Sequence, residues 1–170
     1  MDKQSIQQLS ELLQGKKKIF VVSHKNPDGD AIGSAIGWGR FLKNMGHEVV
    51  VSTPNEYPDF IAWIEGAKDI VMYSQQPEKV KEEVENADLI FCLDFNALQR
   101  IDETGDFIAK AKGKKILIDH HQQPESFPDI TFSDVTACST SQMVFEIIEA
   151  LGQKKLLDAG GAAALYVGIM

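Results

Sequence analysis

Short apolar runs rich in β-branched residues alternate along this chain with segments of helical periodicity. Residues 18–23, 87–94 and 114–119 are apolar at consecutive positions, as strands buried on both faces are. Residues 5–13, 31–45, 58–65, 77–85, 102–112 and 139 onward have helical spacing. The alternation predicts one α/β domain over residues 1–170, a doubly wound parallel sheet with helices on both faces.

Acidic and imidazole side chains follow three of the predicted strands. In an open parallel sheet, ligands bind in the crevice beyond the carboxyl ends of the strands. Each residue alone has an ordinary structural explanation, such as a turn, a helix cap or a surface histidine. Together they predict one polar site at one edge of the sheet, formed by His24, Asp28, Asp30, Asp94, Asp119, His120 and His121.

Carboxylates gathered at one place repel one another unless cations lie between them. Imidazole and carboxylate ligands without thiolate favour Mn²⁺, Mg²⁺, Fe²⁺ or Zn²⁺, and the oxygen-rich mixture favours Mn²⁺ or Mg²⁺. The net charge of −8 argues against a sequence-independent nucleic-acid binder, which needs a basic face. Bound cations would nevertheless allow a small phosphorylated substrate to approach the acidic site.

Three glycines in the predicted helix 31–45 suggest an alternative, a nucleotide-binding α/β domain without metal. Gly33, Gly37 and Gly39 do not fit the G-x-G-x-x-G pattern at a strand-to-helix turn, and no G-K-[S/T] follows. Gly33 and Gly37 are four positions apart and therefore share a helix face. We expect them to let this helix pack closely against the sheet.

The remaining features predict a cytoplasmic protein. Cys92 and Cys138 lie far apart in apolar surroundings and are expected to be buried, reduced thiols. No run of 18 apolar residues and no secretory signal is present, so no membrane association is expected. Ser139 and Gln142 have the spacing of a capping box and predict the start of a helix.

Three segments resemble the motifs of the DHH phosphoesterases. The first resembles H-x-x-x-D-x-D, the second carries an aspartate at a strand end, and the third is the Asp-His-His that names the family. In order they read VVSHKNPDGDAIGSAIG, FCLDFNALQRI and LIDHHQQP. The segment TACSTSQMVFEII also resembles the part of the family that precedes its last motif. The resemblance runs from Ile19 to Met170.

The resemblance implies a role for each of the seven residues. His24 and Asp28 would bind one metal ion, Asp30 would bind a second, and Asp94 would bridge the two. His120 would be a further ligand. His121 would lie near the substrate phosphate and serve catalysis, with Asp119 orienting an imidazole from behind. The implied cofactor is a pair of Mn²⁺ ions, with Mg²⁺ or another divalent cation as an alternative.

One departure from the family pattern concerns the end of the sequence. The family's fourth motif supplies a further ligating aspartate after a Y-x-G-I helix, and here YVGIM is followed by no further residue. The smaller substrate-binding domain that follows in the family is also absent. We therefore expect residues 1–170 to be a DHH catalytic domain truncated before its last motif, with the sixth ligand beyond Met170.

The resemblance implies hydrolysis of phosphate esters by water that the cations activate. The expected substrates are short single-stranded oligoribonucleotides or small nucleotides such as 3'-phosphoadenosine 5'-phosphate. Cyclic-dinucleotide phosphodiesterase, and exopolyphosphatase or pyrophosphatase, are the alternatives within the family. A non-catalytic metal-binding regulatory module is the alternative from another class. A homodimer is possible, through segments outside this chain.

Overall fold

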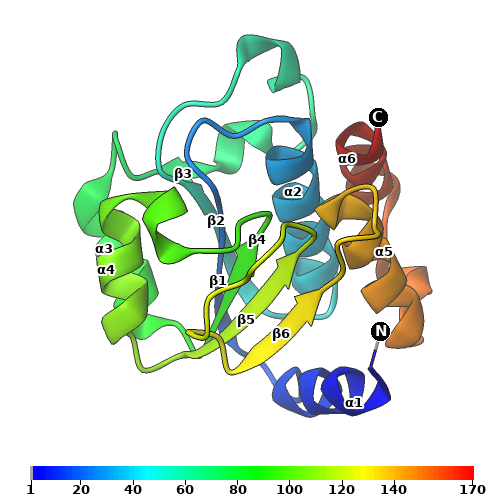
Figure 1. Cartoon of the computed structure of the whole chain (residues 1–170). Helices are drawn as coiled ribbons and strands as arrows, with labels where there is room; N and C mark the ends of the chain where they lie inside the picture. Colours follow the sequence, from blue (N-terminus) through cyan, green and yellow to red (C-terminus); the bar gives the residue numbers. More distant parts are fainter. Residues whose placement is uncertain (1) are drawn as a thin grey trace.

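A computed structural model describes residues 2–170. Its centre is a parallel sheet of order β3-β2-β1-β4-β5-β6 (Figure 1). The order reverses direction between β1 and β4, which is where an open α/β sheet forms its ligand crevice. The strands are β1 (Lys18–Ser23), β2 (Glu48–Thr53), β3 (Val71–Met72), β4 (Leu89–Leu93), β5 (Lys114–Asp119) and β6 (Ile130–Ser133).

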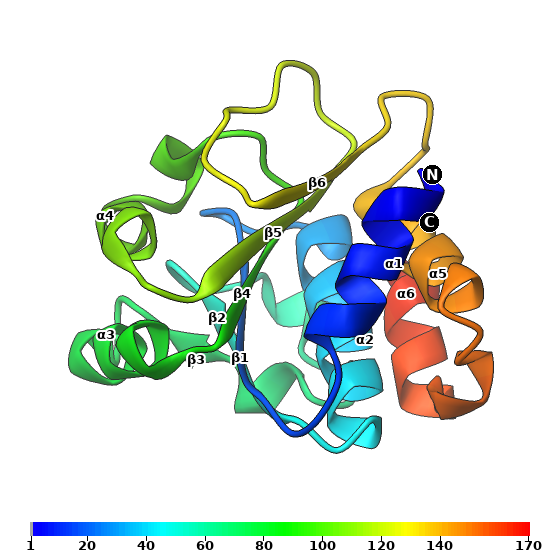
Figure 2. The same ribbon diagram turned by 90° about the horizontal axis from the view of Figure 1, so that it is seen from below.

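Helices cover both faces of the sheet, as Figure 2 shows from below. One face carries α3 (Pro77–Asn86) and α4 (Glu103–Lys110), and the other carries α1 (Lys3–Leu12), α2 (Gly29–Asn44), α5 (Thr140–Ala150) and α6 (Ala159–Ile169). This arrangement confirms the predicted doubly wound fold.

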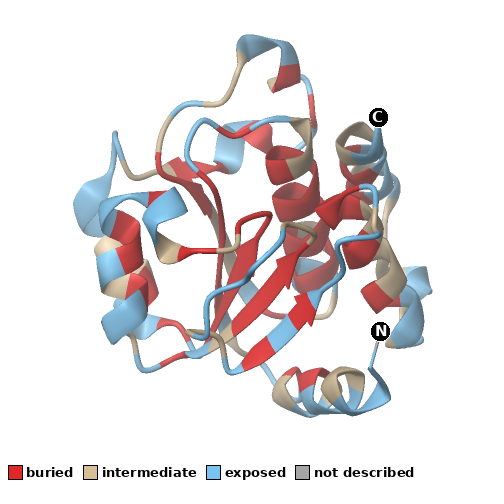
Figure 3. Ribbon diagram, in the orientation of Figure 1, coloured by how far each residue is buried: buried red, intermediate tan, exposed pale blue. Residues whose placement is uncertain are grey.

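Most residues of the strands β1, β4 and β5 are buried (Figure 3). Their alternating side chains belong to two separate cores, one on each face of the sheet. Val21 and Phe91 pack on the side of α2 and α5, whereas Phe20 and Cys92 pack on the side of α3 and α4. The double burial explains why these strands are apolar at successive positions instead of alternating with polar residues.

Gly33 and Gly37 of α2 pack against a helix and not against the sheet, so that part of the prediction was wrong. A Cβ atom on Gly33 would lie 2.4 Å from the carbonyl oxygen of Ala164, and one on Gly37 would lie 2.5 Å from a methyl group of Leu165. Both contacts are with α6. Only Gly39 faces the sheet, where its Cβ would meet Val51 at 2.6 Å.

Three local predictions also need correction. Residues 58–65 do not form an α-helix: a short 3-10 turn covers Asp59–Ile61, and a second one, Ala67–Asp69, follows the segment. The segment predicted as helical from residue 139 onward holds two helices, and the second begins at Ala159, where the side chain of Asp158 accepts a hydrogen bond from the backbone of Gly161 and caps it. Cys92 is buried as expected, whereas Cys138 is exposed.

Within residues 2–170, no helix combines the length and apolarity needed to span a bilayer.

Candidate metal centre

The parallel register brings the ends of β1, β4 and β5 together. Ser23 is aligned with Leu93, and Leu93 with Ile118. The residues that follow these positions are His24, Asp94 and Asp119. Since β1, β4 and β5 run parallel (Figure 1), these three residues lie at the same edge of the sheet. The ends of β1 and β5 therefore place polar groups on either side of the polar group at the end of β4. This is the physical origin of the cluster.

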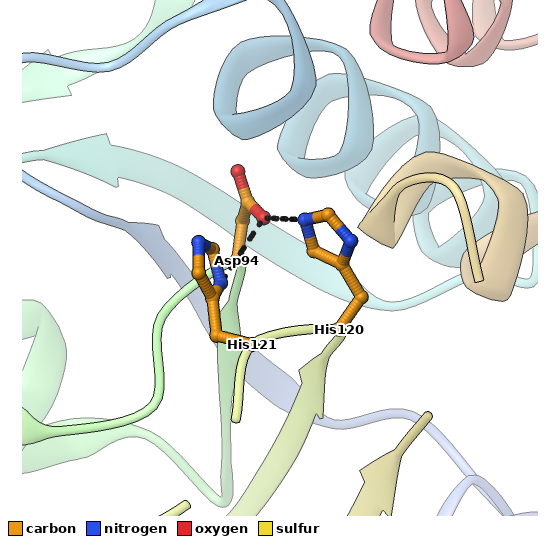
Figure 4. Close-up of side chains that lie close together, drawn as sticks. All are labelled: Asp94, His120 and His121. Atoms are coloured by element: carbon orange, nitrogen blue, oxygen red, sulfur yellow. Dashed lines mark ion pairs between the residues drawn. The ribbon is translucent and has the colours of Figure 1, made fainter. Parts of the chain in front are cut away.

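Asp94 lies at the centre of this cluster and uses both carboxylate oxygens. Its Oδ2 lies 3.5 Å from Nε2 of His24, and its Oδ1 lies 3.6 Å from Nε2 of His120. Oδ1 is also 3.9 Å from Nδ1 of His121. Figure 4 shows His120 and His121 turned toward the carboxylate of Asp94. Asp94 is only 2% exposed, so these interactions occur in a largely dehydrated environment.

The backbone of Asp94 has a φ of +65°, in the left-handed region that few residues other than glycine adopt. Aspartate tolerates this region better than most residues because its short polar side chain bonds locally. The backbone N–H of Asp94 donates to the carbonyl of Ile118, 3.1 Å away, and fixes the turn. Unfavourable backbone conformations of this kind cluster at functional sites.

His24 and His120 are each oriented by a backbone carbonyl. Nδ1 of His24 lies 2.8 Å from the carbonyl oxygen of Lys25, and Nδ1 of His120 lies 3.3 Å from that of Ala137. A carbonyl oxygen only accepts hydrogen bonds, so Nδ1 carries the proton in both rings. Nε2 is then the basic atom, and in both rings it faces carboxylates. Metal-binding histidines are commonly held in this way.

His121 is oriented by Asp119. Nδ1 of His121 lies 2.6 Å from Oδ1 of Asp119, a carboxylate that is completely buried. Because this bond occupies Nδ1, Nε2 is the nitrogen left to act on another group. The arrangement matches the implied pairing of an aspartate with an imidazole. Among the described side chains, the second oxygen of Asp119 has no hydrogen-bond partner.

Asp28 and Asp30 belong to the first turn of α2. The side chain of Asp28 caps the helix by accepting hydrogen bonds from the backbone of Asp30 and Ala31, both 3.0 Å away. Its carboxylate is exposed, and its Oδ1 lies 4.0 Å from Nε2 of His24. Asp30 points the other way, and its Oδ2 lies 3.8 Å from Nε2 of His120. The two aspartates thus lie on different sides of Asp94.

The first turn of α5 holds the carboxylates and was not predicted as part of the site. Backbone N–H groups of Thr140 and Ser141 donate to the two oxygens of Asp30 at 2.7 and 2.8 Å. The hydroxyl of Thr140 donates to Oδ1 of Asp94 at 2.9 Å. The capping residue Ser139 marks the start of this helix in the sequence. The sequence does not reveal which edge of the sheet that helix start approaches.

The electrostatics of the cluster favour a cation. Burial, followed by the charge of Asp94, raises the pKa of Asp30 to about 6. Burial lowers the pKa of His24, but its bonds to Asp94 and Lys25 outweigh this and leave the pKa raised. The negative charge of Asp94 contributes to both shifts, and bound cations would neutralise that charge.

The donor set fits two divalent cations. Ligand atoms of His24, Asp28 and Asp94 lie within 4.8 Å of one another, and so do those of Asp94, His120 and His121. Asp94 belongs to both groups, as a bridging carboxylate would. Asp30 is outside both groups but lies on the His120 side. All seven predicted residues therefore meet at one edge of the sheet.

Comparison with known proteins shows the family of this chain. The model of the DHH family, N-terminal domain, matches residues 18–169. An exopolyphosphatase-related protein from Bacteroides fragilis has a crystal structure with a TM-score of 0.98 and 43% identity. The match covers 99% of this chain and 50% of that one, so this chain spans half the length of that relative.

A shorter sequence match is to probable manganese-dependent inorganic pyrophosphatases of Streptococcus thermophilus. They are 47% identical over 47 residues, which is 26% of this chain and 15% of theirs. The exonuclease RecJ of Thermus thermophilus, solved with Mn²⁺, has a TM-score of 0.59 at 18% identity, covering 98% of this chain and 23% of that one. That likeness concerns the fold alone. The family match extends over most of the sequence, and the chain therefore belongs to the DHH family.

Proposed function

We propose that this protein hydrolyses phosphate esters with two Mn²⁺ ions bound around Asp94. The observation that carries this proposal is the position of Asp94, whose two oxygens face His24 on one side and His120 on the other. Bound divalent cations supply a nucleophile near neutral pH and neutralise charge on the phosphoryl group. Mn²⁺ is proposed because the donors are imidazole and carboxylate. The S. thermophilus relatives are described as probable manganese-dependent inorganic pyrophosphatases.

The chain's own residues have distinct roles in this proposal. His24 and Asp28 hold one cation, Asp30 and His120 hold the other, and Asp94 contacts both. His121 presents Nε2 to the phosphate or its leaving oxygen, because its Nδ1 is bonded to Asp119. The buried carboxylate of Asp119 fixes the orientation of this imidazole, and a positioned imidazole can take part in proton transfer to or from the reacting group.

We further propose that the substrate is a short oligoribonucleotide or a small nucleotide such as 3'-phosphoadenosine 5'-phosphate. Two aromatic side chains support a base-containing substrate: Phe60 is 75% exposed and Trp63 is 69% exposed. Their segment leaves β2 at the same edge as the metal centre (Figure 1), and Asn55 of that segment bonds Asn26 in the loop after His24. Exposed aromatic rings can stack on bases.

An inorganic phosphoanhydride is the second candidate substrate. The B. fragilis relative is described as exopolyphosphatase-related, and the S. thermophilus relatives as probable pyrophosphatases. Pyrophosphate and polyphosphate have no base, so stacking would not contribute to their binding. The two candidates therefore differ in their dependence on Phe60 and Trp63.

The test is a substrate panel with Mn²⁺ or EDTA. It contains a short oligoribonucleotide, 3'-phosphoadenosine 5'-phosphate, a cyclic dinucleotide, pyrophosphate and polyphosphate. We expect manganese-dependent hydrolysis of the oligoribonucleotide and of 3'-phosphoadenosine 5'-phosphate. The KM for these two substrates should rise when Phe60 and Trp63 are replaced by Ala. Hydrolysis of pyrophosphate or polyphosphate without hydrolysis of any nucleotide would show that the substrate is an inorganic phosphoanhydride. Mn²⁺ binding without turnover of any substrate would identify a non-catalytic metal-binding module and contradict the proposal.

A further inference from the structure

We infer that Thr140 is a positioning residue that fixes the bridging carboxylate and so controls binding of the second cation. This inference rests on the proposed two-cation function. Thr140 is completely buried at the first position of α5. Its hydroxyl donates to Oδ1 of Asp94 across 2.9 Å, linking residues that are distant in the sequence.

A carboxylate needs such a partner because rotation about its last side-chain bond is broad and roughly two-fold. Oδ2 of Asp94 faces His24 and Oδ1 faces His120, and rotation away from this orientation would lose both alignments. The hydroxyl of Thr140 has few alternative positions, because a β-branched side chain is restricted at χ1 and threonine in a helix favours two rotamers. A hydrogen bond to a charged, buried acceptor is also stronger than a neutral one.

The same helix turn acts on the second carboxylate of that side. Backbone N–H groups of Thr140 and Ser141 hold both oxygens of Asp30, whose Oδ2 lies 3.8 Å from Nε2 of His120. Thr140 therefore contacts both carboxylates on the His120 side. It makes no such contact with Asp28. Because its hydroxyl bonds Oδ1 of Asp94, the oxygen that faces His120, loss of this hydroxyl should affect the His120-side cation more than the His24-side cation.

The test deletes the hydroxyl while keeping the shape. Thr140→Val removes it, Thr140→Ser retains it, and Thr104→Val is the matched control. Thr104 is a buried threonine in α4 whose hydroxyl has no hydrogen-bond partner among the described residues. Titration calorimetry measures Mn²⁺ affinity and stoichiometry, and electron paramagnetic resonance detects coupling between paired ions. Circular dichroism melting verifies folding.

We expect wild type to bind two coupled ions. Thr140→Val should bind the second ion about 10–100-fold more weakly, the usual effect of removing a group that orients a metal ligand, and should lose the coupled signal. Thr140→Ser and Thr104→Val should resemble wild type. If Thr140→Val melts below the assay temperature, Thr140→Ala makes the same deletion and is judged by the same criteria.

The outcomes separate this inference from the proposed function. Failure of wild type to bind Mn²⁺ would contradict the proposed function itself. Normal binding by wild type together with equal affinity in Thr140→Val would overturn the role of Thr140 alone. A defect in Thr140→Ser as large as that in Thr140→Val would also overturn it, because packing of the methyl group would then be the cause. An equal defect in Thr104→Val would show a non-specific effect and overturn it too.

Discussion

Nε2 of His24 lies 3.5 Å from Oδ2 of Asp94, although the two residues follow different strands. The parallel alignment of β1 with β4 produces this proximity, because Ser23 is paired with Leu93 and the next residue of each strand leaves the sheet. The other oxygen of Asp94 faces His120. A single carboxylate thus connects the two halves of the proposed metal centre, and the predictions below depend on it.

Replacement of Asp94 by Asn should abolish activity without unfolding the protein. Asparagine keeps the shape, tolerates a positive φ and can still accept from Thr140, but it loses the bridging charge. We expect turnover to fall by about 100-fold or more. In EDTA the melting temperature should not fall. The charges of Asp94 and Asp30 repel each other in the metal-free protein, as the raised pKa of Asp30 shows, and the substitution removes this repulsion.

The measurement is manganese-dependent turnover together with thermal melting. Asp106→Asn, an exposed aspartate of α4, is the matched control and should behave as wild type. Wild-type turnover by folded Asp94→Asn would remove Asp94 from the site.

Replacement of His121 by Gln should lower turnover but leave the number of bound ions unchanged. Nδ1 of His121 is already bonded to Asp119, which favours a role toward the substrate. We expect a loss of about 100-fold or more in kcat, as for other general acid–base groups. His120→Gln should instead weaken Mn²⁺ binding. Loss of one bound ion in His121→Gln would show that His121 is a ligand.

Replacement of Gly33 by Ala should destabilise the fold, although alanine favours helices. Its Cβ would lie 2.4 Å from the backbone oxygen of Ala164 and 2.9 Å from the backbone nitrogen of Gly168, so α2 and α6 would have to separate. Overpacking of this kind typically costs about 1–3 kcal/mol. Gly29→Ala is the control on the same helix, because its Cβ would meet nothing closer than 3.6 Å. Urea unfolding of both variants tests this, and equal midpoints would contradict it.

The pair formed by Arg40 and Asp158 should make stability depend on pH in the acid range. Its two hydrogen bonds, of 3.0 and 2.8 Å, hold the pKa of Asp158 at about 2, below the ordinary value of 3.8. A depressed pKa stabilises the folded state above pH 3.8, and this contribution is lost as the pH falls through about 2. Solvent screening keeps it small, since Asp158 is partly exposed.

Asp158→Asn is the informative variant, because asparagine still caps α6 while losing the charge. We expect wild type to exceed this variant in unfolding free energy at pH 7, and the difference to shrink between pH 4 and pH 2. Denaturant unfolding at several pH values measures it. A difference that stays constant with pH would show that the ion pair makes no pH-dependent contribution.

The sequence was sufficient to predict the sheet and the membership of the cluster. Strands such as β4 are apolar throughout because both faces are covered, and acids at their ends are therefore conspicuous. Parallel strands end at a common edge, so His24, Asp94 and His120 were expected to meet without knowledge of any distance. Chemistry fixed to strand ends can be predicted because the sheet positions it.

Contacts between helices were not predictable in the same way. Gly33 was assigned to the sheet but contacts α6, since periodicity identifies a helix face and not its partner. Thr140 was missed for the same reason: its capping neighbour marks a helix start, but only tertiary packing brings that start to Asp94. The helix predicted over residues 58–65 is only a 3-10 turn over Asp59–Ile61, and a second 3-10 turn follows Gly66, whose φ of +101° is left-handed.

The most direct test of the account is a crystal structure of this chain grown with Mn²⁺, with anomalous scattering used to locate the ions. We predict two peaks about 3.5–4 Å apart, one on each side of the Asp94 carboxylate. One peak should be bound by Nε2 of His24 and Asp28, and the other by Nε2 of His120 and Asp30. Peaks elsewhere, or no peak beside Asp94 at saturating Mn²⁺, would contradict the two-metal centre.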